Sequence, residues 1–381
     1  MSAPVEAALS HLAERLPDWI RPGQRPWSAL RSLGPAFVRS PAALERLAPP
    51  EHVRQRWQCD LRVARATNLV TLDALARALA ALRAAGVRPI VFKGAAAVER
   101  LYLDIGCRPM DDADVLVHAG DRGAAVAALV GAGFAPVAVD AGRLGPVGAT
   151  LHAAQAYRRA QGMVAAEIDL HWQPVSDARL RAAFPGCSDH GLWARAQPTT
   201  FAGEPAFALS RVDAPLVTAA AQILGHPWSH PLGYLDLHLM LGALGDDQRR
   251  ELARRARRLG LDRLLYWSLR FTHELFGTEG LEPALKELPV SAAQQRLVEL
   301  LVRGDWLGLA GFRREMTQRD LFVLVLAGPG GLLRLLRASL AAREPDGRRR
   351  AAGLDARSSA RTVRWLAEAA ILTLVERPGR V

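Results

Sequence analysis

The stretch that decides the fold is residues 90–117, IVFKGAAAVERLYLDIGCRPMDDADVLV. It opens with a short apolar run that ends in Gly94, a pattern typical of a buried strand that meets a turn. An alanine-rich segment from 95 to about 103 then favours a helix. The run at 112–117, DADVLV, begins by alternating acidic and apolar residues and indicates a second strand. Residues 90–117 therefore predict a strand–helix–strand unit.

The flanking sequence extends this unit into a mixed fold. Apolar residues at helical spacing predict a long helix over 51–85, which Gly86 would end. A helix is also expected at 121–131, and strands are expected within 148–158 and 164–172. Beyond 210 nearly every segment has helical periodicity. We therefore expect an α+β fold in which a small mixed β-sheet with flanking helices is embedded in a largely α-helical protein.

Changes in composition and periodicity divide the chain into four expected regions. They are an N-terminal helical segment at 1–85, a core with the sheet at 86–205, a C-terminal helical domain at 206–342, and a linker with a terminal helix at 343–381.

Composition narrows the class of protein. Half of the residues are apolar, so the chain can bury a core. The formal net charge of +11 favours anionic ligands, but only two of the 49 basic residues are lysines, and a GC-rich genome explains an excess of arginine equally well. The three cysteines are widely spaced and predict neither a disulfide framework nor a CxxC metal site. No signal peptide and no membrane-spanning run stands out, so a cytoplasmic protein is expected.

The first acidic strand carries a pair of carboxylates. Residues two apart on a strand point to the same face, so Asp112 and Asp114 would lie side by side while Ala113 and Val115 face the core. Two neighbouring carboxylates repel each other unless a cation lies between them. A hard divalent cation such as Mg²⁺, or Mn²⁺ in its place, suits such a pair. The alternative is an ordinary surface strand or turn, because a DxD pattern often arises by chance.

The second acidic strand, EIDLHW at 167–172, repeats this alternation. Ile168 and Leu170 would face the core, which leaves Glu167, Asp169 and His171 on the other face. If the two strands are neighbours, Asp169 completes a cluster of three carboxylates. Glu167 and His171, together with Asp236 farther along the chain, are candidates for a pocket that holds the acceptor of a reaction.

Cationic and glycine residues near the first strand suggest phosphate binding. Gly94 would let a phosphate approach the backbone where a helix begins, and Lys93 precedes it in a chain that almost never uses lysine. Arg108 is a candidate for a triphosphate oxygen, because a guanidinium makes paired contacts with phosphate. The spacing of a P-loop is absent. The alternatives are an ordinary strand–turn–helix corner and a solvated arginine.

These segments together resemble the uncharacterised nucleotidyltransferase family within the DNA polymerase β-type superfamily. The resemblance rests on the KG-x-A turn at Lys93, the RPM-x-D-x-D strand at 108–114, the DLHW strand at 169–172, and the segment YLDLHL at 234–239. It covers roughly 60–270. The wider superfamily has Gly-Ser after the first strand, whereas this chain has Gly94 followed by alanine, so a phosphate contact would have to come from backbone N–H groups or from Lys93.

The resemblance implies a nucleotidyltransferase with Asp112, Asp114 and Asp169 as metal ligands and catalytic residues, and with Lys93, Gly94 and Arg108 at the nucleotide. Mg²⁺ or Mn²⁺ would be the cofactor and a nucleoside triphosphate, ATP among the candidates, the co-substrate. The implied reaction transfers a nucleoside monophosphate to a hydroxyl of an unknown small molecule, peptide or protein, in keeping with a role in biosynthesis. Two alternatives stay open: a catalytically inactive nucleotidyltransferase fold that binds a nucleotide or a partner protein, and an RNA-directed enzyme, for which basic charge is the only support.

Overall fold

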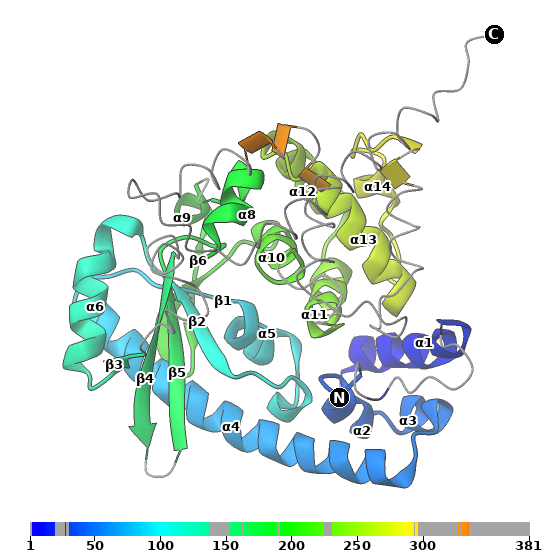
Figure 1. Cartoon of the computed structure of the whole chain (residues 1–381), viewed down its shortest axis with the longest axis horizontal. Coiled ribbons are helices and arrows are strands. Elements are labelled where there is room, and N and C mark those ends of the chain that lie inside the picture. Colours follow the sequence, from blue (N-terminus) through cyan, green and yellow to red (C-terminus); the bar gives the residue numbers. More distant parts are fainter. Residues whose placement is uncertain are drawn as a thin grey trace, which may run out of the picture.

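A computed structural model of the chain gives the arrangement of its elements (Figure 1). It describes residues 2–19, 27, 30–137, 153–161, 164–188, 191–224, 231–292, 294–295, 326–327, 330–331 and 333–334. The linker and terminal helix that we expected at 343–381 lie outside these residues.

The bounds of the elements are as follows. The helices are α1 Ala3–Trp19, α2 Gly34–Val38, α3 Pro41–Leu47, α4 Glu51–Ala84, α5 Lys93–Leu101, α6 Arg122–Gly131, α8 Ala178–Ala183, α9 Leu192–Arg195, α10 Asp213–Thr218, α11 Pro231–Gly242, α12 Asp246–Arg258, α13 Asp262–Phe276 and α14 Glu282–Leu285. The strands are β1 Ile90–Phe92, β2 Asp112–Leu116, β3 Ala135–Pro136, β4 Ala154–Gln161, β5 Val164–His171, β6 Gln197–Phe201 and β7 Glu204–Ala208. Short 3₁₀ turns occur at Ile105–Cys107, Ala119–Asp121 and Pro185–Cys187, and a π-helical turn at Ala219–Ile223.

The strands form one mixed seven-stranded sheet with the order β3-β4-β5-β2-β1-β7-β6. Only β2 with β5 and β1 with β7 pair in parallel, and the other neighbours are antiparallel. The strands expected at 112–117 and 164–172 are confirmed as β2 and β5, and the described part of the strand expected within 148–158 belongs largely to β4. The hairpin of β6 and β7 was not expected from the sequence, and β7 completes the sheet beside β1.

The long helix expected over 51–85 is confirmed as α4, which runs along one side of the sheet. It buries a stripe of apolar side chains, including Leu75, Leu79 and Leu82, against the sheet residues Val115 and Ile168. Burying each such leucine contributes about 1.5–3 kcal/mol. Helix α4 ends before Gly86, whose φ of +73° is the left-handed conformation that glycine adopts without strain.

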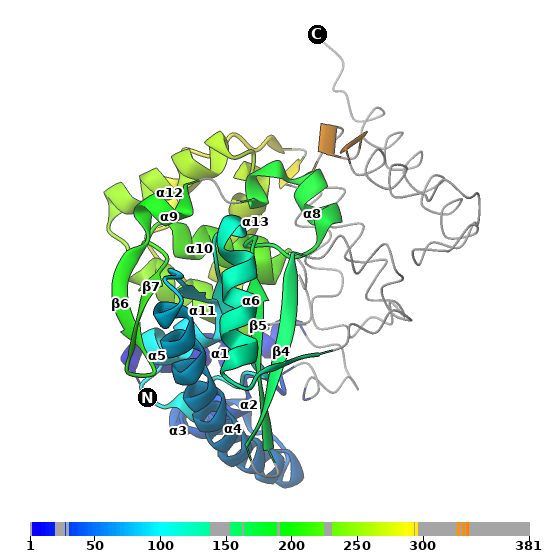
Figure 2. The ribbon, with the colours of Figure 1, turned by 90° about the vertical axis from the view of Figure 1, so that its left-hand side faces the viewer.

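The two faces of the sheet are covered by different helices. Figure 2 shows α4 and α6 in front of the sheet, with α10 and α11 behind it. On the α4 side, Ala113, Val115 and Ile168 belong to one apolar cluster. On the other side, Phe92 and Leu116 pack with Val217 of α10. Because side chains alternate along a strand, the acidic residues of β2 and β5 lie on the face turned away from α4.

The helical part of the chain forms its own core. It joins α1, α2 and α3 to α10–α13, so the first and the later helices share one apolar cluster (Figure 1). Trp267 and Tyr234 are among its largest fully buried side chains. The expected fold class is therefore confirmed: a mixed sheet with flanking helices within a mostly helical protein. Within the described residues, no helix is both long and apolar enough to cross a membrane.

Candidate functional site

Strands β2 and β5 bring the predicted carboxylates together. Their parallel register sets Asp114 opposite Asp169 and Asp112 opposite Glu167. The expectation that the two acidic strands are neighbours is confirmed. Asp114 is nearly buried, whereas Asp169 keeps 24% of its side chain exposed. The pair therefore lies at the border between the protein interior and solvent.

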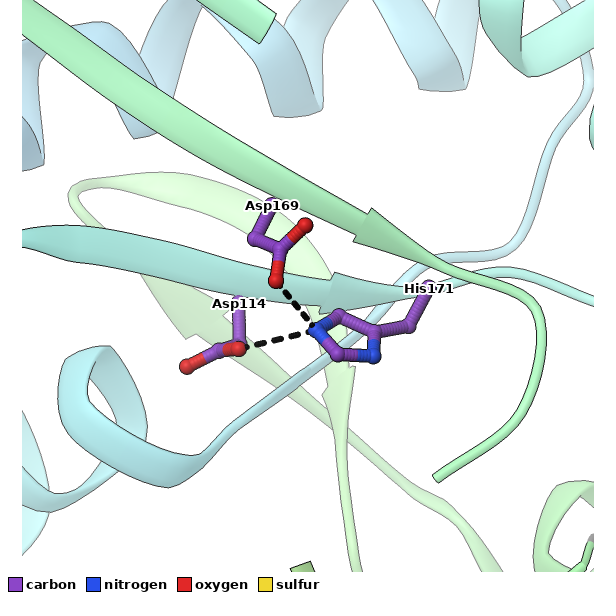
Figure 3. Close-up of side chains that lie close together, drawn as sticks. All are labelled: Asp114, Asp169 and His171. Atoms are coloured by element: carbon purple, nitrogen blue, oxygen red, sulfur yellow. Dashed lines mark hydrogen bonds and ion pairs between the residues drawn. The ribbon is translucent and has the colours of Figure 1, made fainter. Parts of the chain in front are cut away.

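His171 is at the centre of this group (Figure 3). Its Nε2 atom lies 2.9 Å from Oδ1 of Asp114 and 2.9 Å from Oδ2 of Asp169. Phe92 packs edge-on against the imidazole, with 5.1 Å between ring centroids and 86° between the planes. The ring is buried, and its Nδ1 atom has no hydrogen-bond partner in the described part of the chain. One imidazole nitrogen is thus held between two carboxylates.

Lys93 supplies positive charge to the same group. Its Nζ atom donates a hydrogen bond to Oδ1 of Asp114 at 2.6 Å and lies 3.4 Å from Nε2 of His171. Lys93 is the first residue of α5 and has a φ of +49°, a left-handed conformation that costs a residue with a side chain about 1 kcal/mol. This conformation places the lysine where β1 turns into α5, beside the carboxylates of β2.

The donor atoms at this position suit a metal ion. One ligand atom each from Asp114, Asp169 and His171 can be chosen so that all three lie within 4.8 Å of one another. Two carboxylates and an imidazole are common ligands of divalent cations. Asp112 is not part of this closest group, but it lies on the same strand two residues before Asp114 and faces the same way.

The pKa values of the two aspartates of β2 are shifted in opposite directions. Burial raises the pKa of Asp112, and the charges of Asp114 and Asp169 add to this effect, so that its pKa is about 7. Burial also opposes ionisation of Asp114, but Lys93 and His171 outweigh it and lower the pKa of Asp114 to about 2. Lys93 and His171 therefore neutralise Asp114, whereas Asp112 has no ion pair or hydrogen bond of its own among the described residues. A bound divalent cation would remove that imbalance.

Gly94 is favoured by its packing against Arg108. A side chain at position 94 would bring its Cβ to 3.0 Å from Nη1 of Arg108 and to 3.5 Å from Cβ of Met110. The glycine therefore lets the guanidinium of Arg108 pass directly beneath the start of α5. The contact between the backbone at Gly94 and a phosphate stays a prediction.

Arg108 is held in a buried ion pair with Asp236 of α11. Its Nε atom lies 3.0 Å and its Nη2 atom 2.7 Å from Oδ2 of Asp236, and the two side chains are 4% and 1% exposed. The hydroxyl of Tyr102 donates to the other carboxylate oxygen of Asp236 at 2.9 Å. Burial would lower the pKa of Arg108, but the charge of Asp236 outweighs it and raises the pKa. Asp236, predicted as part of an acceptor pocket, thus joins the core to the helical part of the chain.

The ion pairs of Arg108 and Glu167 restrict the roles that the sequence predicts for these two residues. A phosphate contact by Arg108 stays a prediction. It would depend on Nη1, whose hydrogen bond within the described residues is a long one of 3.4 Å to the carbonyl oxygen of Pro109. Glu167 forms an ion pair with Arg158 on the neighbouring strand β4. Its predicted place in an acceptor pocket would therefore require that pair to open.

The comparisons with known proteins agree with the motifs. From the sequence we expected a nucleotidyltransferase with acidic residues on adjacent strands beside a glycine turn. A family model described as uncharacterised nucleotidyltransferase matches residues 27–277. The chain belongs to this family. No curated protein and no solved structure matches the chain significantly.

Some features of the site have no local signature in the sequence. The central position of His171, which we assigned only to an acceptor pocket, depends on the register of β5 against β2. The contact of Tyr102 with Asp236 joins residues 134 positions apart. Alternation on strand 164–172 indicated the face of His171, but no pattern in the sequence indicated the partner of Tyr102.

Proposed function

We propose that the chain is a metal-dependent nucleotidyltransferase that moves a nucleoside monophosphate from a nucleoside triphosphate to a hydroxyl of a small molecule, a peptide or a protein. The observation that carries the proposal is the in-register pairing of Asp114 with Asp169 on adjacent parallel strands, with Asp112 on the same face. Membership of a nucleotidyltransferase family supports the class of reaction.

Different residues would bind the cations and the phosphates in such a reaction. Asp112 and Asp114 would hold the cation that binds the triphosphate, and Asp114 and Asp169 the cation next to the acceptor hydroxyl. When bound, divalent cations neutralise phosphate charge and lower the pKa of the attacking hydroxyl. Lys93, whose ammonium contacts Asp114, and the backbone N–H groups at the start of α5 would lie near the phosphates, because a helix N-terminus favours anions.

The bond changes balance without any further reactant. The acceptor oxygen forms a bond to the α-phosphorus while the bond from that phosphorus to the bridging oxygen of the β-phosphate breaks, and pyrophosphate leaves. Asp169, the more exposed carboxylate, accepts the hydroxyl proton. The protein contributes mainly position and charge stabilisation, because phosphorus transfer needs no covalent intermediate with the enzyme.

Calorimetry with each of the four common nucleoside triphosphates, with Mg²⁺ or Mn²⁺ present, tests the proposal. We expect the wild-type chain to bind at least one of them only when the metal is present, and we expect Asp112→Asn and Asp114→Asn to abolish this binding. Asp111→Asn is the matched control, since this exposed neighbour has the wrong parity for the site.

A second readout addresses the chemistry without a known acceptor. Water can replace the acceptor hydroxyl slowly, so the wild-type chain should release pyrophosphate from the bound triphosphate, and the Asp114→Asn variant should not. Metal-dependent binding without pyrophosphate release, even over days, would instead indicate a nucleotide-binding protein without turnover. Binding that persists in both aspartate variants would contradict the site itself.

A further inference from the structure

The proposed function assigns the metal ions to aspartates, but a nitrogen of His171 lies within 2.9 Å of both Asp114 and Asp169. Figure 3 shows both carboxylates pointing at the same atom, Nε2 of His171. We infer that His171 is a ligand of the cation between Asp114 and Asp169, and that this nitrogen makes the site prefer a first-row transition-metal ion such as Mn²⁺ over Mg²⁺. The inference rests on the proposed metal site and goes beyond it, since it concerns the identity of the ion.

The spacing of the donor atoms fits six-coordinate geometry. Ligands at about 2.1 Å from an ion in an octahedral site lie about 3.0 Å from each adjacent ligand. The Nε2 atom of His171 lies 2.9 Å from an oxygen of Asp114 and 2.9 Å from an oxygen of Asp169. A tetrahedral zinc site with bonds of about 2.0–2.1 Å would need about 3.3–3.4 Å between ligands. The two distances from Nε2 therefore match adjacent ligands of an octahedral ion better than those of a tetrahedral one.

The chemistry of the donors separates Mg²⁺ from the transition metals. Mg²⁺ is a hard ion that takes oxygen ligands and loses its water reluctantly, so an imidazole adds little to its binding. Ions of the first transition row accept imidazole nitrogen together with carboxylate oxygen. Of these, Mn²⁺ combines an octahedral preference with affinity for carboxylates. A set of two carboxylates and one imidazole thus favours Mn²⁺ over Mg²⁺.

The imidazole is fixed in the orientation that coordination needs. The side chain of His171 is 1% exposed, and the ring of Phe92 holds it edge-on from β1. With an ion bound, the ring can carry its single proton on Nδ1, which has no hydrogen-bond partner in the described residues, while Nε2 offers a lone pair to the ion. The ammonium of Lys93, 2.6 Å from Asp114, supplies positive charge to the same carboxylate.

A hydrogen-bonding role is the competing explanation for His171. An imidazolium that only bridges the two carboxylates would give the same distances, and it would leave Mn²⁺ and Mg²⁺ to be discriminated by oxygen ligands alone. The two explanations differ in a single observable, which is whether the nitrogen is bonded to the ion.

Pulsed electron paramagnetic resonance of Mn²⁺ bound to the full chain, without nucleotide, detects that bond directly. We expect a nitrogen coupling from one imidazole in the wild-type chain and in the control His52→Gln, whose histidine is exposed on α4. The coupling should be absent in His171→Gln, and the affinity for Mn²⁺ should fall at least about tenfold. His171→Asp, which restores an all-oxygen site, should shift the preference towards Mg²⁺.

The outcomes separate this inference from the proposed function. Mn²⁺ that depends on Asp114 but shows no nitrogen coupling in the wild-type chain overturns the role of His171 and leaves the carboxylate site intact. Mn²⁺ that does not bind, or that binds equally to Asp114→Asn, overturns both. The coupling is measured on the wild-type chain, so the result stands even if a variant at the buried position 171 fails to fold.

Discussion

The buried ion pair between Arg108 and Asp236 makes a quantitative prediction about stability. Replacing Asp236 with alanine removes the carboxylate that contacts the guanidinium of Arg108 in the described part of the chain. The change leaves that cation and the hydroxyl of Tyr102 without this acceptor. The side chains of the pair are 4% and 1% exposed, so water cannot replace the lost partner without opening the core.

The size of the effect follows from this burial. Breaking a buried ion pair by removing one partner costs about 3–5 kcal/mol, because an uncompensated charge remains. Tyr102→Phe loses one hydrogen bond to a charged group and should cost less, about 1.5–3 kcal/mol. Replacing both charges, as Arg108→Met with Asp236→Leu, removes the uncompensated charge and should recover most of the loss.

Urea unfolding followed by circular dichroism measures these free energies. Asp73→Ala is the matched control, because Asp73 pairs with Arg77 on the exposed side of α4, where both side chains are about half exposed, and its loss should not move the midpoint measurably. A loss below about 1 kcal/mol for Asp236→Ala, or a double variant as unstable as the single one, would refute the reasoning.

Three further predictions concern the site. The pKa of Asp112 is raised to about 7, so the folded chain keeps a proton that the unfolded chain releases near pH 4. The contribution of this proton to the free energy of unfolding is therefore complete below pH 4 and is lost as the pH rises through 7. In EDTA, Asp112→Asn should therefore stabilise the chain by about 2 kcal/mol more at pH 8 than at pH 5, and equal shifts of the urea midpoint at both pH values would contradict this. Lys93→Met removes an ammonium that occupies the carboxylates, so Mn²⁺ should bind about tenfold more tightly in calorimetry without nucleotide, and weaker binding would show that the lysine is not a competitor. Gly94→Ala places a methyl group against the guanidinium of Arg108 and should lower the stability by about 1–3 kcal/mol, whereas Gly123→Ala on the open face of α6 should not lower it; similar melting temperatures for the two would refute the packing role.

Local patterns in the sequence were enough to predict the elements that carry the site. Alternation identified β2 and β5 and the face of their acidic residues, since side chains on a strand repeat every second position. Helical spacing identified α4 because most side chains on its buried face are apolar, with Asn68 and Thr71 as exceptions. The hairpin at 197–208 escaped notice, since Pro198 and Pro205 interrupt its strands and only part of each is buried.

Contacts between distant residues could not be predicted. The pairing of Arg108 with Asp236 joins positions 128 apart, and neither residue has a local pattern that names the other. The left-handed backbone of Lys93 was equally hidden, because lysine is not a residue that indicates positive φ. Alternation alone could not predict that the two acidic strands are neighbours. That expectation came from the resemblance to the family.

The parallel pairing of β2 with β5 also has a consequence for folding kinetics. Asp114 and His171 are 57 positions apart in the sequence. The elements α6, β3 and β4 lie between β2 and β5 along the chain, although the two strands are neighbours in the sheet. Pairing of this kind forms late, because a long loop must close before any contact compensates for it. A cation bound between these strands would therefore find its complete set of ligands only after the barrier to folding has been crossed. We expect such an ion to leave the folding rate unchanged and to slow unfolding, so that it determines how long the native state survives and not how quickly it forms.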